Sequence, residues 1–194
     1  MNFVCRNTYS LAIRMPEWAN QSKSYYVKIN GKRKVIITGK GSHYLHFSRK
    51  WKKGDVVEVH FDMLPRIVKA NPKVEADRGR VAVERGPIVY CAEWPDNRFN
   101  VHSVLLNQHP QFKVTEKPEL LYGINQLTTD AQALSYDMAG KLVAKDVELT
   151  LIPYYAWAHR GEGDMEVWLP IDVSATSTQL QEAGVWEDNG FFKN

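Results

Sequence analysis

Three carboxylates lie close together in the sequence, and paired carboxylates are the groups that glycoside hydrolysis uses. That chemistry needs two acidic side chains about 5 to 10 Å apart, one of them held protonated by burial or by a like-charged neighbour. Glu162, Asp164 and Glu166 form the tightest cluster, but they lie in the segment RGEGDME, whose glycines favour a loop between strands. We interpret them as solvated loop residues and predict no catalytic residue in this chain.

Nucleophilic and metal sites are also poorly supported by the sequence. No G-x-S-x-G turn presents a serine. Cys5 and Cys91 lack the short spacing of a zinc site, and we expect each to be a core thiol. His43 and His46 are followed by His60 on a predicted partner strand, but residues three apart on a strand face opposite sides. We therefore predict no metal site and no cofactor in this chain.

Aromatic side chains are concentrated in one segment near residue 155. Exposed aromatic rings can stack on sugars when polar groups lie nearby, and here His159 lies two residues after Trp157. The same rings could also fill a core or dock against a neighbouring domain. We favour core packing or docking, with sugar stacking as the alternative. The candidate patch consists of Tyr154, Tyr155, Trp157 and Arg160.

Charge gives no indication of a nucleic-acid partner. The 25 basic and 22 acidic side chains are spread along the chain and leave a formal net charge of +3. The densest basic stretches, GKRK at 31–34 and RKWKK at 49–53, lie beside glycines. We interpret both as solvated hairpin tips, with phosphate or polyanion binding as the alternative.

No apolar run approaches the roughly 18 to 20 residues of a membrane span, so no membrane partner is predicted. Residues 1–15 show no continuous apolar block and hence no signal peptide. A periplasmic or a cytoplasmic location would depend on residues preceding this region.

Apolar residues alternate with polar ones in many segments, which is the pattern of strands that bury one face. Asn30-Gly31 predicts a two-residue hairpin turn because both residues tolerate positive φ. A second hairpin is predicted to turn at Lys53-Gly54-Asp55. In the first third of the chain the predicted strands are 11–15, 25–29, 35–37, 45–47 and 57–61.

Further along, Gly86-Pro87 separates two apolar segments. Because proline lacks a ladder donor and glycine relaxes the backbone, we expect a bulge there, or a change of direction or of sheet. The alternation weakens over 116–140, and we expect this stretch to include a short helix or a loop. The predicted strands of this part are 81–83, 88–90, 101–106, 112–114, 147–151 and 167–171.

These elements predict an all-β fold. No segment keeps a 3.6-residue period, and turns recur often, which favours an antiparallel, jelly-roll-like β-sandwich over any βαβ arrangement. The turn-rich segment WPDNRFN suggests a division into two small sandwich domains, 1–94 and 95–172, followed by a polar tail at 173–194. A composition of 44% hydrophobic and 24% charged residues is sufficient for packed cores.

Several stretches resemble one family. They are LAIRMPEWA at 11–19 with VKINGK at 27–32, WKKGDVVEVHFDM at 51–63, GRVAVERGPIVYCAEWPDN at 79–97 and PYYAWAHRGEGDMEVWLP at 153–170. In this order they closely resemble the region that follows the catalytic barrel in glycoside hydrolase family 127, the β-L-arabinofuranosidase-type enzymes of bacteria.

The resemblance implies an N-terminal catalytic (α/α)6 barrel followed by two β-sandwich domains. In that family a cysteine nucleophile, a zinc site of cysteines and a glutamate, and an acid/base glutamate all belong to the barrel, and none of those motifs has a counterpart here. Cys91 belongs to the sandwich pattern of the family. We therefore expect a non-catalytic accessory portion of a glycosidase acting on arabinofuranose-containing glycans, which docks on its own barrel or forms a homodimer. The alternative is a carbohydrate-binding module for plant-type glycans.

Overall fold

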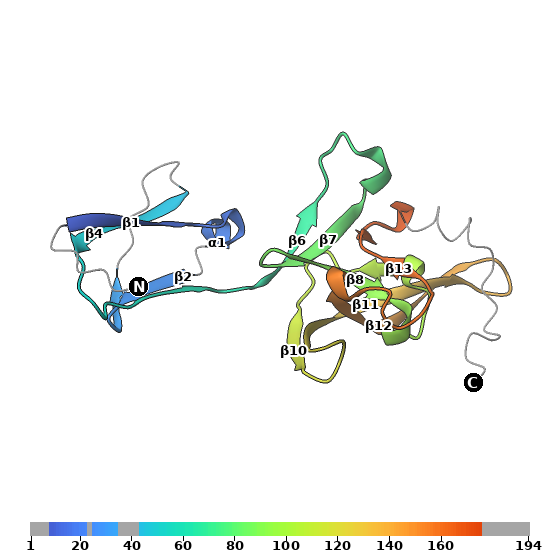
Figure 1. Cartoon of the computed structure of the whole chain (residues 1–194). Helices are drawn as coiled ribbons and strands as arrows, with labels where there is room; N and C mark the ends of the chain where they lie inside the picture. Colours follow the sequence, from blue (N-terminus) through green and yellow to red (C-terminus); the bar gives the residue numbers. More distant parts are fainter. Residues whose placement is uncertain (1–7, 23–24, 35–42, 176–194) are drawn as a thin grey trace. The chain divides into compact units, whose positions relative to one another are not determined.

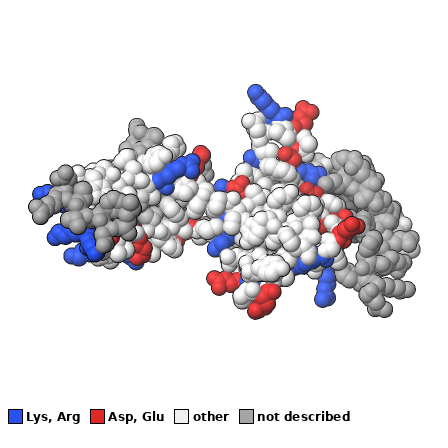
Figure 2. Space-filling view, viewed as in Figure 1, with Lys and Arg blue, Asp and Glu red and all other residues white. Residues whose placement is uncertain are grey.

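The computed structural model describes residues 8–22, 25–34 and 43–175. The chain divides into two compact units, Met1–Leu64 (unit 1) and Pro65–Asn194 (unit 2), whose elements are labelled in Figure 1. The division therefore lies at Leu64, and the predicted boundary at 94/95 falls inside unit 2. Most of the tail predicted at 173–194 lies outside the described residues. On the face shown in Figure 2, charged side chains are scattered over both units among uncharged ones.

The described residues of unit 1 form two small antiparallel sheets and one short helix. One sheet pairs β1 with β4, and the other has the strand order β3-β2-β5. Buried residues from both sheets, including Val27 and Leu45, join Met15 and Ala19 in one core, so unit 1 is a small sandwich. Its elements are β1 (Thr8–Arg14), α1 (Glu17–Ser22), β2 (Tyr25–Ile29), β3 (Lys32–Lys34), β4 (Tyr44–Lys50) and β5 (Val57–Phe61).

The first predicted hairpin of unit 1 is confirmed. Asn30 and Gly31 have φ of 51° and 75° and connect β2 to β3, with Ile29 opposite Lys32. The described part of the return strand is β3, and the predicted strand at 35–37 lies outside the described residues.

The second predicted hairpin is wrong. The chain does turn at Gly54, where φ is 88°, but β4 pairs with β1 and β5 pairs with β2. The two strands belong to opposite layers because both direct their apolar faces toward the shared core.

Unit 2 contains one nine-stranded antiparallel sheet. Its main path has the order β10-β11-β12-β8-β7-β14, with β9 on β11, β13 on β8 and β6 on β7. Because β7 and β8 pair with strands on both sides of the predicted boundary, residues 65–94 cannot belong to unit 1. The strands are β6 (Pro65–Lys69), β7 (Arg80–Arg85), β8 (Ile88–Glu93), β9 (Val104–Leu106), β10 (Lys113–Lys117), β11 (Ile124–Tyr136), β12 (Leu142–Pro153), β13 (Met165–Glu166) and β14 (Leu169–Pro170).

The stretch 116–140 includes the expected loop, at 118–123, but most of it is strand, because it also contains the end of β10 and the whole of β11. The 13-residue β11 has its buried positions at 124, 127, 129, 131 and 134, so the alternation changes phase twice. Thr129 and Ala131 also occupy core positions, where apolar alternation alone would not place them. These two features explain why the strand was missed.

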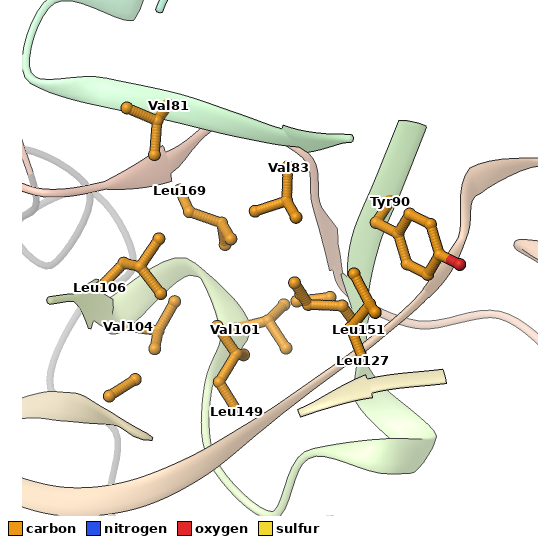
Figure 3. Close-up of a cluster of buried hydrophobic side chains, with 12 residues drawn as sticks. Val81, Val83, Tyr90, Val101, Val104, Leu106, Leu127, Leu149, Leu151 and Leu169 are labelled. Atoms are coloured by element: carbon orange, nitrogen blue, oxygen red, sulfur yellow. The ribbon is translucent and has the colours of Figure 1, made fainter. Parts of the chain in front are cut away.

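The core of unit 2 is formed by apolar side chains that several strands direct toward one another (Figure 3). Val83 from β7, Leu127 from β11, and Leu149 and Leu151 from β12 are all fully buried there. The predicted break at Gly86-Pro87 is a tight hairpin turn, in which Gly86 has φ of 60° and Arg85 lies opposite Ile88. The chain changes direction there, as expected, and no bulge is needed.

Candidate functional site

The predicted aromatic residues lie on the surface of unit 2. The 3₁₀ turn η4 (Tyr154–Ala156) follows β12. Tyr155 is 61% exposed, Tyr154 44% and Trp157 37%. The rings of Tyr154 and Trp157 are nearly parallel, with centroids 5.8 Å apart and 13° between the planes. We name Tyr154, Tyr155 and Trp157 the aromatic patch, and clustered exposed rings of this kind are typical of interaction surfaces.

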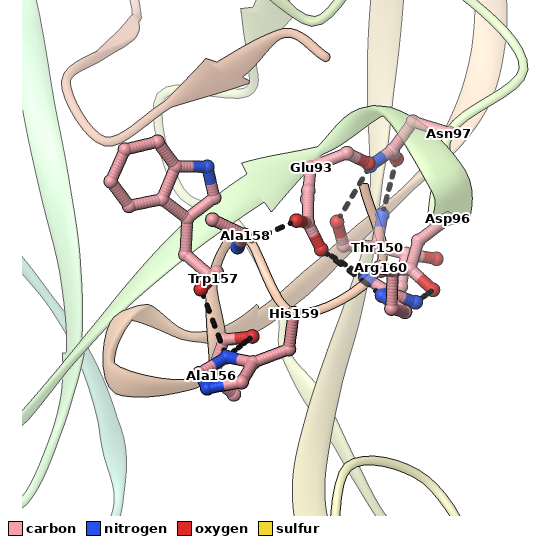
Figure 4. A network of polar contacts seen from close by, with 9 residues as sticks. All are labelled: Glu93, Asp96, Asn97, Thr150, Ala156, Trp157, Ala158, His159 and Arg160. Atoms are coloured by element: carbon pink, nitrogen blue, oxygen red, sulfur yellow. Dashed lines mark hydrogen bonds and ion pairs between the residues drawn. The ribbon is translucent and has the colours of Figure 1, made fainter. Parts of the chain in front are cut away.

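Arg160 does not join the aromatic patch, because its guanidinium turns inward (Figure 4). Its Nη1 and Nη2 donate to the Oδ1 and Oδ2 of Asp96 at 2.9 and 2.5 Å, and its Nε and Nη2 donate to Glu93 Oε2, the former at 3.2 Å. The hydrogen bonds to Asp96, and then those to Glu93, raise the pKa of Arg160 above its usual range. Arg160 therefore acts as the cation that neutralises two carboxylates.

Glu93 is the buried centre of this arrangement, with only 1% of its surface exposed. Burying a carboxylate is unfavourable unless it is paired and hydrogen-bonded. Besides Arg160, Glu93 accepts a hydrogen bond at Oε1 from the backbone N–H of Ala158, at 3.0 Å. Ala158 has φ of 66°, which is uncommon for a residue other than glycine. Glu93 thus fixes the backbone just after Trp157.

Asn97 extends the connection to β12. Its side-chain amide donates to the backbone oxygens of Glu93 and Thr150, at 2.9 and 3.0 Å, and its Oδ1 accepts from the Thr150 N–H at 2.9 Å. Sequence reasoning missed these roles, although EWPDN follows an apolar strand directly and is rich in polar groups. We name this set of residues the anchoring network. It comprises Glu93, Asp96, Asn97 and Arg160.

The three clustered carboxylates differ in their surroundings. Glu162 and Asp164 are exposed, as expected, but the Glu166 side chain is only 13% exposed. Glu166 Oε2 lies 2.9 Å from His102 Nδ1, and its Oε1 lies 3.8 Å from Arg80 Nη1. Glu166 is therefore an ion-paired residue rather than a solvated one.

His102 in turn lies between two carboxylates. Its Nε2 is 3.8 Å from Asp164 Oδ1. The hydrogen bond that His102 donates to Glu166 raises the pKa of His102, against the opposing effect of burial. This group ties the turn η3 (Val101–Ser103) to β13, a structural role that the sequence did not indicate.

The candidate metal and nucleophile residues are separated. His46 lies on β4 and His60 on β5, in different sheets, and His43 precedes β4. Within residues 8–22, 25–34 and 43–175, no three histidine, cysteine or acidic side chains are placed to hold a metal ion. Cys91 is fully buried, and burial raises the pKa of its thiol to about 12. Cys5 lies outside the described residues.

Two family models match the chain, one on each unit. Residues 4–63 match the model described as "Beta-L-arabinofuranosidase, GH127 middle domain". Residues 65–170 match the glycoside hydrolase family 127 C-terminal domain. The chain belongs to glycoside hydrolase family 127. The two matches meet at the division between unit 1 and unit 2, and the predicted resemblance is confirmed.

Relatives in glycoside hydrolase family 127 share both sequence and fold with this chain. It is 32% identical over 170 residues to a non-reducing end β-L-arabinofuranosidase of Bifidobacterium longum. A solved GH127 β-arabinofuranosidase is 70% identical, with a TM-score of 0.81 over 87% of this chain. A GH127 β-L-arabinofuranosidase from Geobacillus stearothermophilus is 34% identical, with a TM-score of 0.76 over 84% of this chain.

The chain spans about a quarter of the length of these proteins, with coverage of 25%, 28% and 26% respectively. This corresponds to the middle and C-terminal domains of the family. In the part of the chain that the structure describes, no helix has both the length and the apolar character needed to cross a membrane.

Proposed function

We propose that this chain is the non-catalytic accessory portion of a β-L-arabinofuranosidase-type glycosidase, and that it packs against the catalytic (α/α)6 barrel through the aromatic patch. The observation that carries the proposal is the exposure of three large rings on a turn that the anchoring network holds. Membership of family 127 supports the glycosidase context, and the two matches are to the middle and C-terminal domains of that family.

The energetics favour docking by these particular residues. Tryptophan and tyrosine dominate the binding energy of protein interfaces, and fully burying a large apolar side chain contributes about 1.5 to 3 kcal/mol. Tyr154 and Trp157 already stack on one another, and Glu93 fixes the backbone at Ala158. A surface that is ordered in advance loses less entropy on binding.

The test uses a complete enzyme. This chain would replace the corresponding region of the 70%-identical relative, and calorimetry would record whether barrel and accessory domains unfold together. We expect one transition for the parent chimera. The double variant Tyr155→Ala/Trp157→Ala should separate it into two transitions, with less hydrolysis of an aryl arabinofuranoside at elevated temperature.

Tyr122→Ala provides the matched control, because Tyr122 is a fully exposed tyrosine of the same unit outside the aromatic patch. It should leave the transition unchanged. If the double variant unfolds in the same single transition as the parent, the aromatic patch is not the docking surface.

A second candidate function is glycan binding by the same rings. The near-parallel arrangement of Tyr154 and Trp157 favours it, because such rings can stack on sugar faces. This function predicts that arabinan in a native gel retards the 194-residue chain relative to serum albumin, and that Trp157→Ala removes the retardation. Migration equal to that of albumin would leave docking as the function.

A further inference from the structure

The two basic stretches noted in the sequence lie side by side in unit 1. Asn30 Nδ2 donates to Asp55 Oδ1 at 2.8 Å, and Asn30 Oδ1 accepts from the Val56 N–H at 2.9 Å. Asp55 Oδ2 also accepts from the Lys52 N–H at 2.9 Å. These bonds join the β2–β3 hairpin to the turn before β5. The stretches 31–34 and 49–53 therefore lie near one another.

The net charge of the whole chain conceals how unevenly its charges are divided. Unit 1 carries 12 of the 25 basic and 4 of the 22 acidic residues, a formal charge of +8. Unit 2 carries the other 13 and 18, a formal charge of −5. Basic and acidic residues occur along the whole chain, as noted above, but the two units differ in the sign of their net charge. Unit 1 alone is strongly basic and can attract a polyanion.

Most cations of the two basic stretches form no ion pair with the described residues, although Arg49 lies 3.6 Å from Asp55. Of the acidic residues in unit 1, Glu58 pairs with Lys28, Asp62 with His60, and Asp55 accepts the bonds described above. No ion pair among the described residues of unit 1 engages the remaining exposed lysines and arginine of the two stretches. We name these residues the basic surface: Lys32, Arg33, Lys34, Lys50, Lys52 and Lys53.

Aromatic rings lie among these cations. The Tyr26 ring stacks on His60 with centroids 4.8 Å apart, and the Arg33 guanidinium lies 5.4 Å from the Tyr26 centroid. Arg49 lies over Trp51 at 5.2 Å, but Trp51 is only 7% exposed, so its ring supports the cation and offers no face to a ligand. Tyr26 likewise holds Arg33 in place, and cations held in this way complement the carboxylates of a polyanion.

We propose that the basic surface of unit 1 binds a polysaccharide that bears carboxylate groups. Family membership favours this ligand over a nucleic acid, because the chain's relatives are glycosidases. The site is separate from the aromatic patch, which lies in unit 2. In this way the accessory portion would hold an acidic region of a glycan while the enzyme acts elsewhere on it.

The test measures fluorescence anisotropy of a labelled oligogalacturonate, with the complete chain at low salt. We expect binding that weakens steeply between 10 and 100 mM salt, as the screening length shortens from about 30 to 10 Å. The same oligomer after reduction of its carboxyl groups should bind at least about tenfold more weakly. Lys32→Ala/Arg33→Ala/Lys52→Ala should also lose about tenfold in affinity, since each exposed ionic contact contributes modestly.

The control variant Lys113→Ala/Lys141→Ala/Lys145→Ala removes the same charge from unit 2 and should bind like the parent. An equal loss in this control would mean that net charge rather than the basic surface attracts the polymer, and would overturn the proposal. Equal binding of the carboxyl-reduced oligomer would also overturn it. Stronger binding of single-stranded DNA at equal charge concentration would assign the surface to nucleic acid instead.

Discussion

The backbone N–H of Ala158 donates a hydrogen bond to the buried carboxylate of Glu93 at 3.0 Å. The interaction joins an exposed turn to the end of β8 across 65 residues of sequence. Because Ala158 follows the aromatic patch directly, the position of the patch depends on a carboxylate that solvent cannot reach. Changes to the anchoring network should therefore affect both the stability of unit 2 and the order of its surface.

Replacing Arg160 should be strongly destabilising. Arg160→Met leaves Glu93 buried without its cation, which costs about 3 to 5 kcal/mol in comparable cases. Urea denaturation followed by tryptophan fluorescence measures the free energy of unfolding. The double variant Glu93→Gln/Arg160→Met should recover part of the loss because it removes the Glu93 charge and leaves only Asp96 without its cation. A loss below about 1 kcal/mol, similar to that of a solvent-exposed pair, would contradict this account.

The stability of unit 2 should depend on the protonation of His102. Its pKa in the folded state is raised by Glu166, so the stabilisation is complete below the unfolded pKa of about 6.5 and is lost as pH rises through the folded value. The melting temperature of unit 2 should accordingly fall as pH increases from about 6. His102→Gln and Glu166→Gln should each flatten this fall. An unchanged pH profile in both variants would exclude His102 as its source.

Cys91 should be unreactive in the native protein. Its pKa of about 12 keeps the thiol protonated near neutral pH, and no solvent reaches it. In a Cys5→Ser background, iodoacetamide at pH 8 should label Cys91 only after denaturant is added. Peptide mass spectrometry measures the labelled fraction. Rapid native labelling would mean that β8 opens to solvent.

Gly163 should tolerate no side chain. A Cβ atom at this position would lie 2.0 Å from Cδ1 of Trp94, so either the loop or the indole must move. We expect Gly163→Ala to cost about 1 to 3 kcal/mol of unfolding free energy, as other overpacking substitutions do. The cost should be smaller in a Trp94→Ala background, and a double-mutant cycle measures the difference. Equal costs in both backgrounds would show that Trp94 is not the obstacle.

Local features of the fold could be predicted from the sequence, whereas the pairing of strands into sheets could not. The Asn30-Gly31 turn was predictable because its two residues determine their own backbone conformation. The pairing of β4 with β1 was not, because alternation shows which face is buried but not which strand lies alongside. β11 was missed because its buried positions change phase.

The candidate site was predictable in composition but not in arrangement. The aromatic segment was recognisable, yet nothing in its sequence separates the exposed Tyr155 from the fully buried Tyr90. The contact between Glu93 and Arg160 spans 67 residues, so no local pattern reveals it. The adjacency of the two basic stretches likewise depends on Asn30 and Asp55 meeting in space.

The pairing of β14 with β7 has a consequence for synthesis of the chain. Leu169 lies opposite Val81, so the sheet of unit 2 is complete only when residues about 90 positions apart have both emerged from the ribosome. The strand pairings of unit 1, by contrast, end at Phe61. We expect unit 1 to fold first during translation, while unit 2 keeps unpaired strand edges until residue 170 is available. Those edges are the part of the nascent chain most exposed to aggregation and most dependent on chaperones.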